Sequence, residues 1–267
     1  MKNILVLIHD DTGQEARLQV ALDVTRMLNG HLTCLDVVIP PAAMTDDMLG
    51  GTVGVVLLAD EVSRETLNRT RIEDRLAHEE VSWEWAEATG RIAPSLRDAS
   101  RFADLIVVNR QLHDFPVPDM RAVAAEVIAR SRKPVLAVPE DERRLDTECA
   151  MIAWNGSTSA MAALRQAIPL LARSERVLLV QVNEGAGDGS AEAAASYLSR
   201  YDIHVRIERI AALPEGAGPT LVDQAVRHQA GYIVAGGFGR ARLAETLFGG
   251  VTRELLTNAP CPIFMAH

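Results

Sequence analysis

Gly231-Tyr232-Ile233-Val234-Ala235, followed at once by Gly236-Gly237-Phe238-Gly239, is the stretch around which the architecture is built. The apolar run predicts a strand that is buried on both faces of a parallel sheet. Nine residues later, Gly249-Gly250-Val251-Thr252 opens an amphipathic run that ends at Leu256. The pattern therefore predicts a strand, a glycine loop and a helix start. Such a loop can bring backbone N–H groups close to a phosphate, although glycine can equally serve only to permit tight turns.

The same pattern occurs earlier in the chain. Asp104-Leu105-Ile106-Val107-Val108 corresponds to residues 231–235, and Ser131-Arg132-Lys133-Pro134-Val135 corresponds to Ala259-Pro260-Cys261-Pro262-Ile263. We therefore predict an internal duplication, with one domain at residues 1–140 and a second at residues 149–267. The charged stretch between them lacks apolar periodicity and is interpreted as a linker.

Each half alternates apolar runs with amphipathic segments of helical spacing. The predicted strands are 4–8, 31–39, 81–85, 104–108 and 134–138 in the first half, and 150–154, 176–182, 203–210, 232–235 and 262–266 in the second. This alternation predicts an α/β fold of two tandem, doubly wound, Rossmann-like domains, each with a five-stranded parallel sheet in flavodoxin-like order. In such sheets a ligand binds at the carboxyl ends of the strands where the order reverses. We expect strands one and four to flank that point, which places Asn155 beside the Gly236 loop.

Two segments of the first half fit this scheme less directly. Residues 42–59 match neither strand nor helix cleanly and are predicted to be a loop or short helix, followed by a helix over 61–80. The alternation around Trp83 and Trp85 places both indoles on one face of a strand, where packing is the favoured interpretation because each buries a large area.

Composition excludes several classes of function. The 267-residue chain has a net charge of −9 and no basic stripe, which argues against a nucleic-acid partner. Its three cysteines are widely separated, so neither a disulfide framework nor a metal site is expected, and a reducing cytoplasm is the expected location. No apolar run is long enough for a membrane helix.

The second half resembles the universal stress protein family, and the whole chain resembles its tandem form. The resemblance is carried by Ala153-Trp154-Asn155-Gly156-Ser157, by the spacing Gly236-x-x-Gly239-x9-Gly249-Gly250-Val251-Thr252, and by the ending Ala259-Pro260-Cys261-Pro262-Ile263. It implies a stress-response or regulatory protein, linked to a nucleotide where one binds, rather than a metabolic enzyme. Family members with the full motif bind ATP, whereas others of the same fold do not. It also implies that strands 134–138 and 262–266 pair across a pseudo-twofold axis, as a pseudo-dimer that leaves further homodimer formation open.

The resemblance implies a nucleotide site in the second half. Its adenine and ribose region would be Ala153, Trp154, Asn155 and Val182, and its phosphate region would be Gly236, Gly239, Gly249, Gly250 and Val251. Three residues depart from the family pattern. Asn155 replaces an acid, Gly250 replaces a hydroxyl residue, and Trp154 is bulky enough either to stack on adenine or to fill the pocket.

The first half has no counterpart of the glycine loop. Asn109-Arg110-Gln111-Leu112 follows its fourth strand, and His9-Asp10-Asp11 follows its first, where carboxylates would repel phosphate. We therefore predict an unliganded first half and interpret His9 as a polar residue at a strand edge. No P-loop or nucleophile-elbow motif is present, so no catalysis is expected, with slow ATP hydrolysis left open. The alternative function is a nucleotide-free scaffold that uses Gly50-Gly51 as part of a contact surface.

Overall fold

The computed structural model describes residues 1–39, 52–112, 119–183, 190–237 and 250–267. The first half contains β1 (Asn3–Ile8), α1 (Gln14–Leu28), β2 (His31–Val38), α2 (Thr52–Leu76), β3 (Ser82–Thr89), α3 (Ile92–Ala99), a short 3-10 helix (Ser100–Phe102), β4 (Leu105–Asn109), α4 (Met120–Arg130) and β5 (Val135–Val138). The second half contains β6 (Cys149–Trp154), α5 (Thr158–Leu171), β7 (Arg176–Asn183), α6 (Ala191–Ser199), β8 (Val205–Ala211), α7 (Ala217–Arg227), β9 (Tyr232–Gly236), α8 (Gly250–Asn258) and β10 (Ile263–Ala266).

All ten strands form one sheet in the order β3-β2-β1-β4-β5-β10-β9-β6-β7-β8. Strands within each half are parallel, and β5 pairs antiparallel with β10, with Leu136 opposite Phe264. The predicted pairing of the two fifth strands is thus confirmed. The flavodoxin-like order is wrong, because the strands of each half have the order 3-2-1-4-5 that is typical of the Rossmann fold. Strands buried on both faces carry similar apolar runs, so the sequence pattern does not identify their neighbours. Strands one and four are adjacent as predicted.

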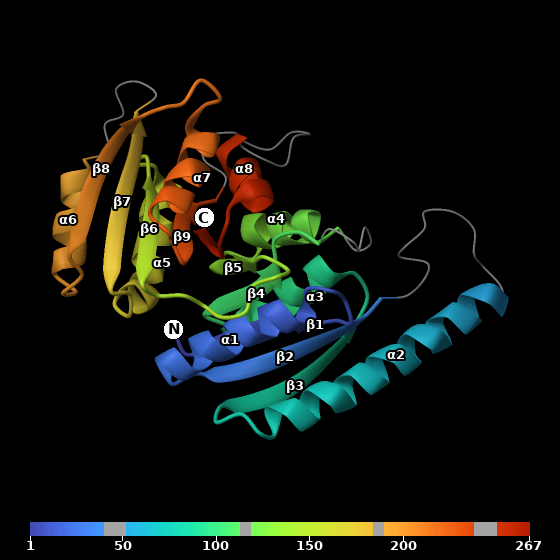
Figure 1. Ribbon diagram of the computed structural model, residues 1–267. Coiled ribbons are helices and arrows are strands. Elements are labelled where there is room, and N and C mark those ends of the chain that lie inside the picture. Colours follow the sequence, from blue (N-terminus) through green and yellow to red (C-terminus); the bar gives the residue numbers. More distant parts are fainter. Residues whose placement is uncertain (40–51, 113–118, 184–189, 238–249) are drawn as a thin grey trace.

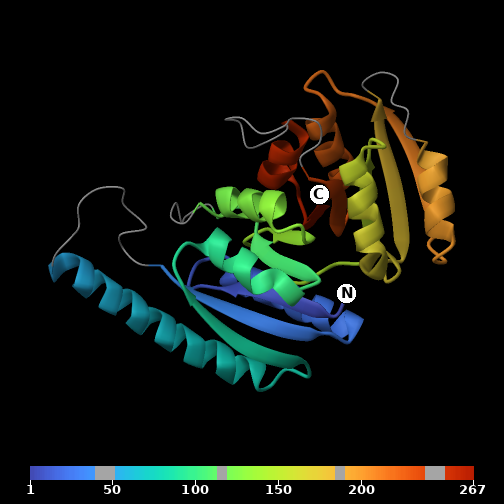
Figure 2. The ribbon, with the colours of Figure 1, turned by 180° about the vertical axis from the view of Figure 1, so that it is seen from behind.

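The sheet is covered on both faces, which explains the continuous apolar runs of its central strands. Alternate residues point to opposite sides: Ile4, Val6 and Ile8 pack with α1, α2, α5 and α6. Leu5 and Leu7 pack into a second core with α3, α4, α7 and α8. The two views in Figures 1 and 2 show these layers from opposite sides. Each core extends through both halves, so the two halves share their packing.

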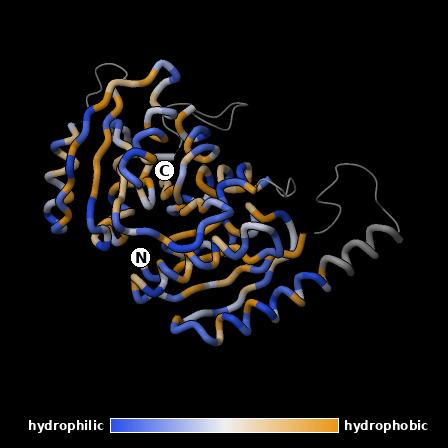
Figure 3. Tube along the Cα trace, viewed as in Figure 1, coloured by the Kyte–Doolittle hydropathy of each residue, from blue (hydrophilic) through white to orange (hydrophobic). Residues whose placement is uncertain are grey.

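Helix α2 is longer than expected. It begins at Thr52 and runs for 25 residues, so the prediction of a loop or short helix is wrong for residues 52–59. The part of the insert that includes Gly50 and Gly51 lies outside the described residues. Figure 3 shows polar and apolar residues interspersed along the described part of α2, which packs through Ile72 and Leu76. No helix in the described ranges is long and apolar enough to cross a membrane.

The two tryptophans of β3 pack as predicted. Both are partly buried against the core on the α1 and α2 side. The guanidinium carbon of Arg69, on α2, lies 5.3 Å from the centre of the Trp85 ring, a distance typical of a cation–π contact. These contacts attach α2 to the outermost strand of the sheet.

Candidate functional site

A cavity of about 230 Å³ opens at the carboxyl ends of β6, β7 and β9. Its lining residues are Ala153, Trp154, Asn155, Ser157, Ser159, Val182, Ala217, Leu221, Ala235, Gly236, Gly250, Val251 and Thr252. It lies where the strand order of the second half reverses between β6 and β9, the usual ligand position in open α/β sheets.

Seven of the nine residues predicted for the nucleotide site border this one cavity. They are Ala153, Trp154, Asn155, Val182, Gly236, Gly250 and Val251. Gly239 and Gly249 lie outside the described residues. The sequence did not nominate Ala217, Leu221 or Ala235. Ala235 could have been found from the pairing of strands one and four, because it lies opposite Ala153 in the sheet. Nothing in the sequence indicated that α7 borders the cavity.

The amino ends of three helices meet at the cavity. Ser157 and Ser159 belong to the start of α5, Ala217 begins α7, and Gly250 to Thr252 begin α8. The first N–H groups of a helix have no partner within the helix, and its amino end carries a partial positive charge. The cavity is therefore bordered by backbone groups suited to an anion.

Trp154 and Asn155 have distinct structural roles at the end of β6. The Trp154 side chain is 6% exposed and packs in the core on the α5 side of the sheet. Ala153, its neighbour in the strand, faces the opposite side. The indole thus fills space beneath α5, and its placement does not favour stacking on a ligand. Asn155 is exposed, and its Oδ1 accepts a hydrogen bond from the Ser157 N–H at 3.0 Å.

Ser157 is the N-cap of α5, because its Oγ accepts from the Ala160 N–H at 3.2 Å. Side-chain oxygens of this kind satisfy one of the free N–H groups of the first turn. Asn155 and Ser157 together therefore fix how the chain turns from β6 into the helix at the cavity edge.

Gly236 is required by packing. A Cβ atom at this position would lie 2.5 Å from the Ala160 nitrogen and 2.7 Å from the Ser159 carbonyl carbon. Both are backbone atoms of the first turn of α5, so neither can move aside as a side-chain tip could. The sequence pattern predicted Gly236 to be part of a phosphate loop. Its observed contacts instead explain the glycine by the close approach of the end of β9 to the first turn of α5.

Gly236→Ala is expected to destabilise the protein by about 1–3 kcal/mol, because the added methyl group displaces α5. Gly250→Ala is the matched control. A Cβ at Gly250 would meet no described atom within 4 Å, so alanine at this first position of α8 should leave the stability nearly unchanged. Urea denaturation of both variants checks this difference, and equal stability would contradict the packing role of Gly236.

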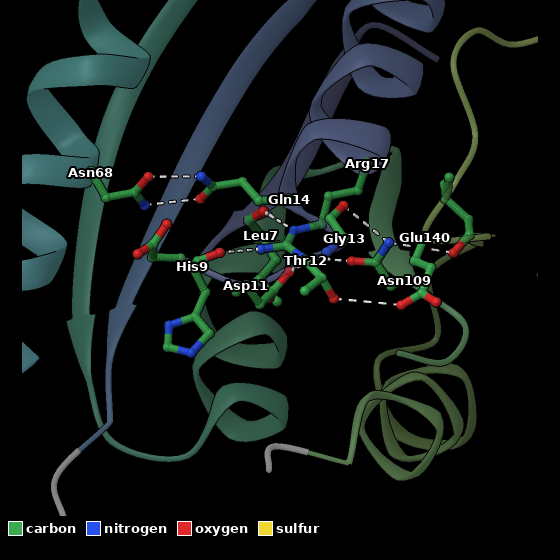
Figure 4. Close-up of polar contacts among 12 residues, drawn as sticks. Leu7, His9, Asp11, Thr12, Gly13, Gln14, Arg17, Asn68, Asn109 and Glu140 are labelled. Atoms are coloured by element: carbon green, nitrogen blue, oxygen red, sulfur yellow. Dashed lines mark hydrogen bonds and ion pairs between the residues drawn. The ribbon is translucent and has the colours of Figure 1, made fainter. Parts of the chain in front are cut away.

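The corresponding crevice of the first half is filled by Arg17 (Figure 4). This side chain is fully buried. Its Nε donates to the Leu7 carbonyl at 2.7 Å, and its Nη2 donates to the His9 carbonyl at 2.6 Å. Its Nη1 lies 2.6 Å from Asp11 Oδ1 and 2.5 Å from Asn109 Oδ1. Asn109 ends β4 as Gly236 ends β9, so side chains occupy the first half where the second has a glycine.

His9 is buried, so its interpretation as a polar edge residue is wrong. Its Nδ1 lies 2.8 Å from Glu65 Oε1 on α2, and both side chains are almost inaccessible. Glu65 also accepts from the Asp10 N–H and from Asn68 Nδ2, at 3.2 Å each. Burial by itself would raise the pKa of Glu65, but the contacts with His9, Asp10 and Asn68 hold it below its usual value. No motif in the sequence indicates the contact between His9 and Glu65, because Glu65 lies on α2, beyond the insert and far from His9 in the chain.

Asp36, on β2, is the other buried carboxyl near this pair. Burial, reinforced by the negative charge of Glu65, raises the pKa of Asp36 from 3.8 to about 7. Glu87 acts in the same direction, whereas His9 and Arg69 act against it. A carboxyl in this position is stabilised in its protonated form.

The chemistry of the remaining described residues is limited. They contain no group of three or more His, Cys, Asp or Glu side chains that could hold a metal ion. The three cysteines are free and buried, and burial raises the pKa of Cys34 and of Cys261 to about 12. Such thiols stay protonated near neutrality and are poor nucleophiles.

Comparisons with known proteins agree with this architecture. The model of the universal stress protein family matches residues 150–267. A universal stress protein from Archaeoglobus fulgidus has a similar structure, with a TM-score of 0.76 and 15% identity over 99% of this chain and 97% of that one. A functionally unknown protein from Pseudomonas aeruginosa gives a TM-score of 0.60 and 15% identity over 99% and 92%. No curated protein matches the chain.

At 15% identity the two structures establish the fold, and they do so over both halves. The family match covers the half that contains the cavity and the glycine spacing. Residues 150–267 therefore match the universal stress protein family, and the first half repeats the same fold.

Proposed function

We propose that the second half binds an adenine nucleotide in the cavity at the ends of β6 and β9. The observation that carries this proposal is the convergence of the α5 and α8 amino ends on a cavity whose opposite wall is apolar. Ala153, Val182 and Leu221 suit a base and ribose, and the start of α8 suits phosphates. Membership of residues 150–267 in the family supports the same ligand class.

The charges around the cavity favour an anion. None of the three helices whose amino ends border it has an acidic residue in its first turn. Proteins commonly place Asp or Glu there to compensate the helix dipole. In the first turns of α5, α7 and α8 no acidic side chain supplies this negative charge, and the phosphates of a bound nucleotide would supply it.

We propose that each chain binds one nucleotide, with residues 1–140 as a structural domain and residues 149–267 as the binding domain. In the first half, the Arg17 side chain fills the crevice and the Asp11 carboxylate lies beside it. A phosphate placed there would have to displace four hydrogen-bonded groups and approach a carboxylate.

The function we infer is regulatory, in a stress response, with binding rather than turnover as its chemical event. The described cavity residues include serine, threonine and asparagine but no His, Asp or Glu. Among them, none is an evident general base for hydrolysis. Nucleotide occupancy would then act through the conformation of the protein or its choice of partner.

Val251→Glu provides a sharp test, because it should raise the stability of α8 and weaken ATP binding together. Val251 lies in the first turn of α8 and is partly exposed. An acid there interacts favourably with the helix dipole but repels phosphate. We expect ATP affinity to fall at least tenfold, which corresponds to about 1.4 kcal/mol. Isothermal titration calorimetry with ATP measures this affinity.

Val251→Gln is the matched control, because it has a similar size and shape without the charge, and it should bind ATP nearly as well as the unchanged protein. Equal affinity of both variants would place the phosphates elsewhere.

Titration should also give one site per chain. If the unchanged protein neither retains a nucleotide on purification nor binds ATP at millimolar concentration, the proposal fails, and the nucleotide-free scaffold becomes the better account.

A further inference from the structure

Arg110, the first residue after β4, reaches from the first half to the last turn of α8. Its Nη1 donates to the carbonyl oxygens of Leu256 at 3.2 Å and Thr257 at 2.7 Å. The last four carbonyls of a helix lack partners within it, and its carboxyl end carries partial negative charge. The guanidinium therefore caps α8 by both hydrogen bonding and charge. Burial lowers the pKa of Arg110, and the nearby Cys261 and acidic residues 140–142 oppose that shift.

An equivalent contact runs in the opposite direction. Gly237 follows β9 as Arg110 follows β4, and their N–H groups donate to Ala266 and Val138, the last residues of the adjacent fifth strands. A Cβ at Gly237 would lie 2.7 Å from Ile128 Cγ2 on α4. Thus the residue after the fourth strand of each half contacts the helix that precedes the fifth strand of the other.

These two contacts bracket the glycine segment of the candidate site. Gly237 lies just before residues 238–249, and α8 begins at Gly250, directly after them. The amino end of α8 borders the cavity, whereas its carboxyl end is held by Arg110. Since α8 has only nine residues, a shift at one end is transmitted to the other as a rigid-body movement.

We infer that Arg110 is a positioning residue for the nucleotide site of the other half. By capping α8 it holds the amino end of that helix in register with the cavity, and the first half thereby supports binding in the second. This inference rests on the proposed function. Because coupling between sites is reciprocal, nucleotide binding should in turn strengthen the contact between Arg110 and α8.

The test compares Arg110→Met with Arg110→Lys and with Arg130→Met. Methionine keeps the apolar stem of arginine but cannot donate, whereas lysine restores a cation that can reach the same carbonyls. Arg130 is an exposed residue of α4 that pairs with Glu126, so its variant controls for the loss of a positive charge. Titration with ATP is made at a temperature where all variants are fully folded.

We expect a five- to tenfold loss of ATP affinity for Arg110→Met, partial recovery for Arg110→Lys and no change for Arg130→Met. Hydrogen exchange without nucleotide should be faster in α8 of Arg110→Met than in the unchanged protein. Binding by the unchanged protein together with equal binding by Arg110→Met would overturn the inference alone. Failure of the unchanged protein to bind ATP would instead overturn the proposed function, and the role of Arg110 with it. If Arg110→Met does not fold, Arg110→Gln takes its place, because the shorter, uncharged glutamine side chain cannot cap α8 as arginine does. Wild-type affinity and exchange rates for Arg110→Gln would overturn the inference.

Discussion

Replacement of Arg17 by methionine is expected to lower the free energy of unfolding by about 3–5 kcal/mol, because it leaves the Asp11 carboxylate buried without its partner. The Arg17 and Asp11 side chains are both inaccessible to solvent. The carbonyls of Leu7 and His9 would also lose the hydrogen bonds from Arg17, although the His9 carbonyl keeps its bond from the Asp11 N–H. Since whole proteins are stable by only about 5–15 kcal/mol, the variant should unfold at a clearly lower urea concentration.

Two further variants separate the buried charge from simple loss of volume. In Arg17→Met combined with Asp11→Asn, no unpaired charge remains, so part of the lost stability should return. Arg26→Met removes a partly exposed arginine that pairs with Asp23 and Glu79, and should cost at most about 1 kcal/mol. A loss below 1 kcal/mol for Arg17→Met itself would show that the network contributes little.

Asp36→Asn is expected to stabilise the protein above pH 7 and to have little effect near pH 4. The pKa of Asp36 is raised to about 7 in the folded protein from 3.8. The folded state therefore binds more protons than the unfolded state between these values, and stability falls as the pH rises through that interval. Asparagine removes this dependence. About three pKa units at 1.36 kcal/mol each set an upper limit of roughly 4 kcal/mol.

Urea denaturation at pH 4, 6 and 8 measures the effect of Asp36→Asn. Asp104→Asn serves as a control of opposite sign. Burial alone would raise the pKa of Asp104, but the N–H groups of Asn3 and Lys2 hold it below its usual value. That variant should therefore lose stability at neutral pH and lose less in acid. If the difference in stability between Asp36→Asn and the unchanged protein is the same at all three pH values, the pKa of Asp36 is not raised in the folded protein.

Much of the fold could be predicted from the sequence because the sheet is covered on both faces. Strands such as β4 and β9 then become uninterrupted apolar runs between polar turns. The resemblance to the tandem form of the universal stress protein family implied the pairing of β5 with β10. The order of strands within each half could not be obtained this way, since an apolar run does not specify which neighbours it has.

The candidate site was predictable in part for the same reason. Residues at the ends of β6 and β9, such as Ala153 and Gly236, meet because parallel strands end at one edge. Contributions from α7 and from the carboxyl end of α8 were not accessible, as Leu221 and the cap by Arg110 show. Arg17 carried a weak signal: it lies four residues before Ala21 and seven before Val24, on the apolar side of α1. A charge at that place is expected to have a buried partner.

The antiparallel pairing of β5 with β10 has a consequence for what each half can become. In an assembly of two identical subunits, every substitution occurs twice, so both crevices would be filled or both would stay open. Here the two partners are encoded separately, and Asn109 and Gly236 differ at equivalent places. Joining them in one polypeptide also makes their association independent of dilution. Because the two halves are covalently linked, they cannot exchange with halves of other molecules. Every molecule therefore contains one half of each kind.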